Sequence, residues 1–267
     1  MAPKTLWTDE YTLLCERCGY VVEGLATDGA CPECGKPIAE SLPERRVGTL
    51  WQQERDLNTL FATMRETLFS VGYTLWCLRA DATSARSLRT ATIVMSVVIA
   101  AWPAFALTEF TLRMNGAREP YTGFQSAMLW IAPLSAPLVL CIVLQALTWT
   151  EARGLCFLSA RRGFRIDRTL ANAICAHGCV GWFLASAGTA IGSTLLLAST
   201  HADGSTYEQG NEWVWLAYGM GLIITGGSLL LGFFFFELFA WLGLRRCKYA
   251  NRARTGSGAS NPSTPHP

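Results

Sequence analysis

Hydrophobic and polar residues are distributed unevenly along this chain of 267 residues. Four long stretches contain no Asp, Glu, Lys or Arg: Thr90 to Thr108, Pro120 to Thr150, Thr169 to Ala202 and Trp213 to Phe236. A helix needs about 20 apolar residues to cross the roughly 30 Å hydrocarbon core of a bilayer. The pattern therefore predicts four transmembrane helices within residues 90–246. Because the third stretch has 34 residues, a bundle of five helices is the alternative.

Composition agrees with a membrane protein. Hydrophobic residues make up 51% of the chain and charged residues 16%, whereas soluble domains carry about 25% charged residues. We therefore expect an all-α transmembrane helix bundle, in contact with the lipid bilayer, rather than a soluble enzyme. The net charge is only +2, which gives no overall field that would attract nucleic acid.

Basic residues indicate the orientation of the predicted bundle. Only Arg113 and Arg118 fall on one side, while thirteen basic residues fall on the side that holds both termini. Cytoplasmic loops carry an excess of Lys and Arg, so the N- and C-termini are predicted to be cytoplasmic. A fifth helix would break this alternation. The thirteen are Arg79, Arg86, Arg89, Arg153, Arg161, Arg162, Arg165, Arg168, Arg245, Arg246, Lys248, Arg252 and Arg254.

A second hydrophobic pattern precedes the first apolar stretch. Apolar residues recur at steps of three and four from Leu57 to Leu78, which is the period of one helix face. We interpret residues 49–89 as an amphipathic helix on the surface of the cytoplasmic leaflet. Packing of that helix on the bundle is the other interpretation.

The N-terminal segment, residues 1–48, carries the candidate chemistry. Two C-x-x-C pairs are separated by 12 residues, and a glycine, Gly19 or Gly35, follows each pair. Each pair forms a tight turn whose two sulfurs converge on one metal, and the glycine can adopt positive φ where the chain turns back. This spacing predicts a tetrathiolate metal site in a zinc ribbon of short β-hairpins. The predicted ligands are Cys15, Cys18, Cys31 and Cys34.

The metal could be zinc or iron on spacing alone. Closed sites made only of cysteines are typical of structural zinc, which we favour. A rubredoxin-like iron site is the alternative. Disulfides would need an oxidising compartment, and redox-active pairs would need a thioredoxin-like context that the sequence lacks. A segment this short cannot build a large core, so the metal would supply its folding energy.

Small residues line one face of each of the last two predicted helices. They recur at three- and four-residue steps and allow close approach of two backbones in lipid. We predict that these two faces pack on each other within the chain, with a homo-oligomer through the same faces as the alternative. The residues are Gly178, Gly181, Ala185, Gly188 and Gly192 in one helix and Gly221, Thr225, Ser228 and Gly232 in the next.

Other polar groups in the predicted membrane region have structural interpretations. Cys175, His177 and Cys179 lie within one helical turn, but three ligands cannot close a zinc shell, so we expect apolar packing. We predict that Glu237 pairs with Arg245 or another interfacial arginine, with a role in solute transport as the alternative.

Catalytic signatures are missing from the sequence, which contains no G-x-S-x-G, Walker loop or H-E-x-x-H motif. We therefore predict no enzymatic activity. Within the cysteine segment, Arg17 and Lys36 face an excess of acidic residues, so nucleic-acid binding is disfavoured. Residues 247–267 are rich in Ser, Gly, Pro and Arg and are predicted to form a disordered cytoplasmic tail.

The motifs C-E-R-C-G-Y and C-P-E-C-G-x-P-I, the linker R-R-x-G-T-x-W and the ending G-L-R-R-C-K-Y-A-N-R resemble those of bacterial zinc-ribbon polytopic membrane proteins. The bundle is loosely similar to the Yip family of membrane-trafficking proteins. The resemblance implies a non-enzymatic membrane protein with a cytoplasmic structural zinc ribbon. We expect a scaffold or adaptor for a cytoplasmic protein. A membrane-tethered iron electron carrier and, with less support, a small-solute transporter are the alternatives.

Overall fold

The computed structural model describes residue 9 and residues 11–114, 123–200 and 212–252. Five helices build the long part of the molecule. They are α4 (Ala82–Met114), α5 (Gly123–Arg162), α6 (Arg168–Gly178), α7 (Val180–Ala198) and α8 (Glu212–Arg246). The helices α6 and α7 meet at Cys179, whose backbone stays in the right-handed helical region (φ −57°, ψ −13°), so together they form one span.

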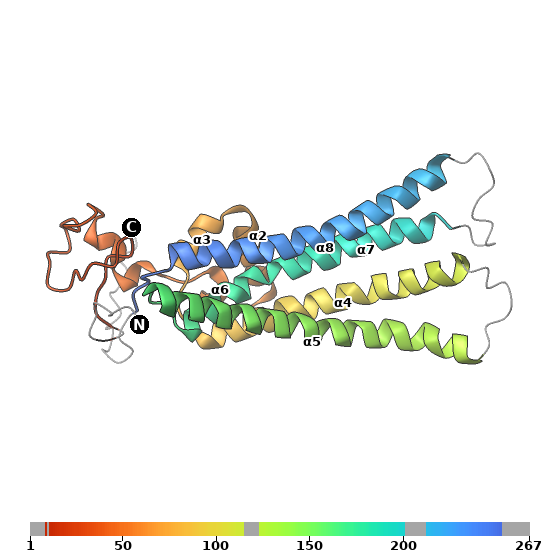
Figure 1. The fold of residues 1–267 in the computed structure, drawn as a ribbon, viewed down its shortest axis with the longest axis horizontal. Coiled ribbons are helices and arrows are strands. Elements are labelled where there is room, and N and C mark those ends of the chain that lie inside the picture. Colours follow the sequence, from red (N-terminus) through yellow and green to blue (C-terminus); the bar gives the residue numbers. More distant parts are fainter. Residues whose placement is uncertain (1–8, 10, 115–122, 201–211, 253–267) are drawn as a thin grey trace, which may run out of the picture.

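Within the described residues, four spans are long and apolar enough to cross a membrane, which agrees with the predicted number. They are Ala82–Arg113, Ser135–Arg162, Arg168–Ala198 and Glu212–Arg246. The described part of the 34-residue stretch, residues 169–200, therefore contains one span and not two. The spans lie side by side along the long axis of the molecule, and the N-terminal module, α2, α3 and α6 gather at one end (Figure 1).

The outward surface of the spans is apolar. Only 17% of the most hydrophobic window in the α8 span is buried inside the chain, and Ile223, Leu230 and Phe234 are largely exposed. Large contiguous apolar surfaces are rare on soluble monomers. A lipid environment satisfies these side chains, which agrees with a membrane protein.

The closest helix packing is between α7 and α8, along the predicted small-residue faces. A Cβ added to Gly181 would overlap the backbone of Gly232, and one added to Gly188 would overlap Ser228. Backbones can approach this closely only where side chains are minimal. The prediction that the two faces pack together within the chain is confirmed. A homo-oligomer through the same faces stays a prediction.

Residues 49–89 differ from the single amphipathic helix that we predicted. They form α1 (Leu50–Gln53), α2 (Leu57–Phe69), α3 (Val71–Cys77) and the start of α4. Ser70, with φ −135° and ψ 44°, interrupts the apolar stripe. Leu60 and Met64 are buried in the bundle core, whereas Leu57 and Phe61 are exposed. Packing against the bundle therefore divides the apolar stripe. This favours the interpretation that the segment packs on the bundle over the one that it lies on the membrane surface.

The N-terminal module contains little regular structure. Two short 3₁₀ helices, η1 (Ile38–Ser41) and η2 (Pro43–Arg45), follow the cysteines. The described residues contain no β-strand, only isolated antiparallel bridges from Leu14 to Val21 and from Ala30 to Pro37. The module has a small core of its own, formed by Cys15, Val22, Cys31 and Ile38. The short β-hairpins of a zinc ribbon therefore stay a prediction.

Candidate metal centre

The four predicted cysteines converge on one point. Their Sγ atoms all lie within 4.8 Å of one another, with 3.5 Å between Cys15 and Cys34 and 3.6 Å between Cys18 and Cys31. Zinc–sulfur bonds of about 2.3 Å in a tetrahedron place sulfurs about 3.8 Å apart. The cluster is therefore the right size for one tetrahedrally bound metal ion. Among the described residues it is the one such group of metal-ligating side chains.

Two similar backbone turns place these sulfurs. Gly19 N–H donates to Cys15 O at 2.8 Å, and Gly35 N–H donates to Cys31 O at 2.9 Å. Both glycines have positive φ, +81° and +72°, a conformation that costs other residues free energy because of Cβ sterics. The expected role of the two glycines is thereby confirmed.

The Cys18 thiol holds its proton when no metal is bound. Burial, together with the neighbouring thiols, raises the pKa of Cys18 to about 12, while the backbone N–H of Tyr20 acts in the opposite direction. A bound metal must displace this proton, because the thiolate is the form that binds. The donor set of four soft sulfurs suits zinc or iron and leaves no position for a substrate.

Asn251 fastens the cysteine module to the bundle. Its side-chain Oδ1 accepts from Leu14 N–H at 3.0 Å, and its Nδ2 donates to Leu14 O and Ser41 O, each at 2.7 Å. Its backbone N–H donates to Glu16 Oε1 at 3.1 Å. The residue is 6% exposed, so these bonds form away from water, where unpaired groups are costly.

A buried ion pair joins the module to α3. Arg46 donates to both carboxylate oxygens of Glu16, at 2.8 and 3.1 Å, and its remaining nitrogen donates to Leu75 O and Leu78 O. Both side chains are less than 9% exposed. Separating the module from α3 would leave each of these charges buried without its partner, which is strongly unfavourable. The ion pair therefore favours one orientation of the module.

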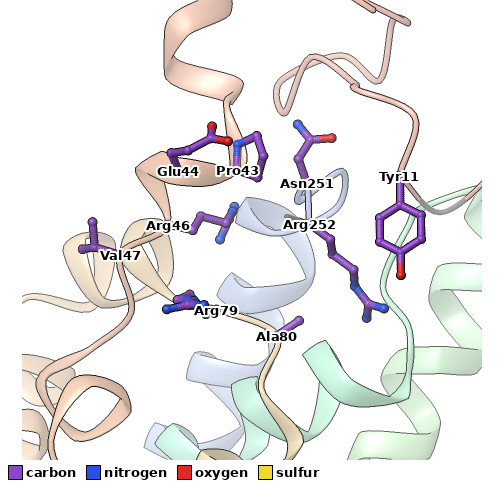
Figure 2. A pocket seen from close by; sticks show the side chains of 9 residues that line it. All are labelled: Tyr11, Pro43, Glu44, Arg46, Val47, Arg79, Ala80, Asn251 and Arg252. Carbon is purple, nitrogen blue, oxygen red and sulfur yellow. The ribbon is translucent and has the colours of Figure 1, made fainter. Parts of the chain in front are cut away.

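The segment after α8 adds further contacts between the cysteine module and the bundle. We call this contact region, which includes Glu16, Arg46 and Asn251, the joint. The ring of Tyr249 lies against Gly19 and makes a T-shaped contact with the ring of Phe164, with the two ring centroids 5.8 Å apart. Arg252 forms an ion pair with Asp167. Figure 2 shows Arg46, Asn251 and Arg252 around a cavity of about 410 Å³ at this joint. The cysteine module is thus packed onto the bundle rather than attached by a loose linker.

Sequence reasoning did not find Glu16, Arg46 or Asn251. We expected a disordered tail from Cys247, but residues 247–252 are packed against the module and the bundle, with Cys247 and Asn251 buried. Residues 253–267 lie outside the described residues. The unusual ending K-Y-A-N-R after the last helix, which combines aromatic and amide groups with cations, is the one signal that could have indicated a docked segment.

Residues inside the bundle with candidate chemistry have structural partners. His177 Nδ1 donates to Ala173 O at 2.8 Å, so Nε2 accepts from the Thr49 hydroxyl at 3.2 Å. Cys175 and Cys179 are buried in the core. These contacts agree with packing and do not form a second metal site among the described residues.

The predicted ion pair of Glu237 is wrong for the described residues. Arg245 instead lies over the ring of Trp241, with 4.5 Å from Cζ to the ring centroid, and no described basic group lies within ion-pair distance of Glu237. Cation–π contact competes with the carboxylate for the guanidinium. The carboxylate is partly exposed, at the end of the bundle that holds the cysteine module.

Comparison of the chain with protein-family models, curated proteins and solved structures found no match. The resemblance to zinc-ribbon membrane proteins and to the Yip family therefore stays a prediction.

Proposed function

We propose that this protein is a non-enzymatic integral membrane protein whose cysteine module is a structural zinc ribbon, and that it acts as a membrane scaffold or adaptor for a cytoplasmic partner. The observation that carries the proposal is the buried joint through Glu16, Arg46 and Asn251. A module held in one orientation by buried polar bonds presents a fixed surface. A fixed surface is what a docking platform requires, because less entropy is lost on binding.

We favour zinc as the metal of this site. The four sulfurs form a closed shell, and the module's own apolar core consists of four side chains, two of which are ligands. A core this small cannot fold a segment by itself, so metal binding would supply the free energy. Structural zinc in an all-cysteine site does this without redox chemistry.

The cytoplasmic orientation rests on the basic residues. Arg254 lies outside the described residues, and the other twelve of the predicted thirteen lie on segments at the ribbon end of the bundle (Figure 1). Because Lys and Arg accumulate on the cytoplasmic side, we place the ribbon, the 163–167 connection and the segment after α8 there.

The partner would contact an exposed surface of the ribbon. Residues 23–28 are exposed and include Leu25, which is 42% exposed, with Glu23 and Asp28 nearby in sequence. An apolar side chain flanked by carboxylates suits a partner with an apolar pocket and a basic rim.

In-cell crosslinking tests this function. A photoreactive residue in place of Leu25 should give a discrete adduct with a soluble protein, whereas one in place of Leu230, which is exposed on the lipid side of α8, should not. Substituting Cys15 and Cys34 by Ser should remove the Leu25 adduct, because the ribbon loses its metal. The adaptor function is wrong if positions across residues 23–28 give no adduct in cells.

A membrane-tethered iron electron carrier is the second candidate. Cys18 and Cys34 are only partly buried, and electron transfer from an iron–thiolate site needs one exposed sulfur edge rather than an open coordination position. Metal analysis separates the two candidates, since zinc has no accessible redox change.

A further inference from the structure

A second cavity, of about 530 Å³, lies where the ribbon, α3 and the end of α8 meet. Its wall is strongly basic, with six cationic residues from three segments. The ribbon contributes Arg17 and Lys36, the linker contributes Arg46, and the end of α8 contributes Arg245, Arg246 and Lys248.

Among the described residues, the cations at the end of α8 have no carboxylate partner, whereas Arg17 and Lys36 would lie next to the negative charge of a metal-bound tetrathiolate. The single carboxylate in the wall, Glu16, is already bound to Arg46. Lys36 lies 4.0 Å from Glu40, which is the limit of an ion pair. Among the described residues no carboxylate lies within 4.0 Å of the cationic groups of Arg17, Arg245, Arg246 or Lys248. The carbonyl end of α8 supplies a partial charge of only about −0.5, so the α8 side of the cavity stays positive and can attract an anion.

The wall of α3 leaves room for one of these cations. A Cβ added to Gly72 would lie 2.5 Å from Arg246 Nη1. The missing side chain therefore lets the guanidinium lie against α3 at the cavity. An arginine fork presented in this way matches the oxygens of a phosphate group.

The position of the cavity selects the source of the anion. The α8 span, Glu212–Arg246, has 35 residues, which is more than the roughly 20 that cross the hydrocarbon core, so its charged end can reach the headgroup region. Tyr73 and Trp76 line it and are 53% and 41% exposed, as aromatic side chains are at membrane interfaces.

An apolar track leads from the cavity into the membrane. The side chains of Leu231, Phe234, Leu238 and Trp241 are exposed and recur at three- and four-residue steps, in line with Arg245. Residues at this spacing share one helix face. An acyl chain can lie along this face while its headgroup occupies the basic cavity.

We infer that this cavity binds the phosphate of an anionic phospholipid headgroup from the leaflet next to the ribbon. Basic cavities at the cytoplasmic ends of transmembrane helices are suited to such headgroups. A bound lipid would join the ribbon, α3 and α8 through one phosphate. The site does not need a cytoplasmic partner, so it can fail or hold independently of the adaptor function.

Native mass spectrometry of the full-length, metal-loaded protein tests the site, with palmitoyl-oleoyl phosphatidylglycerol as the probe and the matching phosphatidylcholine as the neutral reference. The test variant combines Arg245→Gln, Arg246→Gln and Lys248→Gln. The matched control combines Arg153→Gln, Arg161→Gln and Arg162→Gln, which removes the same charge from exposed positions at the end of α5. Each variant is first checked for its metal content and thermal unfolding.

We expect phosphatidylglycerol to bind the wild type more tightly than phosphatidylcholine. The α8 triple variant should lose at least about tenfold in affinity, and the α5 triple no more than about twofold. A ribbon-side variant, Arg17→Gln with Lys36→Gln, should also weaken binding, by about fivefold. It tests the cavity if the α8 variant does not fold.

Equal losses in the α8 and α5 triples would overturn the site, because they would show diffuse attraction to positive charge. Inorganic phosphate tests whether the cavity binds a soluble phosphate compound instead of a lipid. If it binds the wild type, is lost in the α8 triple and is not displaced by phosphatidylglycerol, the lipid assignment is overturned in favour of a soluble phosphate compound.

Discussion

The contact between Gly19 and Tyr249 allows a sharp test of ribbon docking, because the chain contains its own control. Gly19 and Gly35 occupy equivalent positions in the two cysteine turns, with φ of +81° and +72°. A Cβ on Gly19 would lie 2.7 to 3.0 Å from three carbons of the Tyr249 ring, whereas a Cβ on Gly35 would meet nothing within 4 Å.

The two alanine variants should therefore differ by one physical effect. Both place an alanine at positive φ, which costs about 1–2 kcal/mol. Only Gly19→Ala must also displace the Tyr249 ring. The centroid of this ring lies 5.8 Å from the Phe164 ring centroid and 5.3 Å from Lys248 Nζ. Overpacking of this kind costs about 1–3 kcal/mol. The difference corresponds to about 5- to 150-fold in the equilibrium between docked and undocked ribbon.

Hydrogen exchange of the full-length, metal-loaded protein measures this difference. The reporter is the amide of Leu14, which donates to Asn251 Oδ1 across the joint. We expect its exchange to be faster in Gly19→Ala than in Gly35→Ala by the factor above, since exchange follows local opening. Adding Tyr249→Ala to Gly19→Ala should restore most of the protection.

Equal exchange in Gly19→Ala and Gly35→Ala would refute the reasoning, since it would mean that the Tyr249 ring does not hold the ribbon. Failure of Tyr249→Ala to restore protection, with metal content unchanged, would do the same.

Three further predictions concern the joint and the bundle. Arg46→Met should destabilise the protein by about 3–5 kcal/mol, because the buried Glu16 carboxylate loses its countercharge, and adding Glu16→Leu should recover much of the loss in a denaturant titration. Gly188→Ala should lower the unfolding temperature, since overpacking costs about 1–3 kcal/mol, whereas Gly226→Ala, whose Cβ meets nothing within 4 Å, should leave it unchanged or raise it. Burial alone would raise the pKa of Asp167, but the pKa is lowered by its hydrogen bond with the Arg252 guanidinium and, to a smaller extent, by its bonds with backbone N–H groups. Its stabilisation is therefore complete above the ordinary carboxyl pKa of about 3.9 and lost as the pH falls through the lower native value, and Asp167→Asn should remove that part of the acid dependence of unfolding.

Features that depend on local spacing could be predicted from the sequence. The apolar stretches determined the four spans, because a helix in lipid satisfies its own backbone hydrogen bonds whatever its neighbours are. The spacing of Cys15, Cys18, Cys31 and Cys34 determined the cluster, and Gly19 and Gly35 have the positive φ expected of their position.

Features that depend on contacts between distant segments could not be predicted. Asn251 bonds to Leu14, which is 237 positions away in the sequence, and nothing in the local pattern at either end indicates that partner. The kink at Ser70 has the same origin, since burial of Leu60 and Leu75 in the bundle core sets the directions of α2 and α3. Among the described residues, the ion pair expected for Glu237 is not formed, and Arg245 lies over Trp241 instead.

The most direct test of the proposed zinc ribbon is the metal content of the full-length protein, purified from a reducing cytoplasm without added metal. We predict about one zinc ion per chain and no visible colour, with loss of the zinc in the variant that carries Cys15→Ser and Cys34→Ser. One iron ion per chain with red thiolate charge-transfer absorption, or a metal-free protein whose Leu14 amide remains protected, would contradict it.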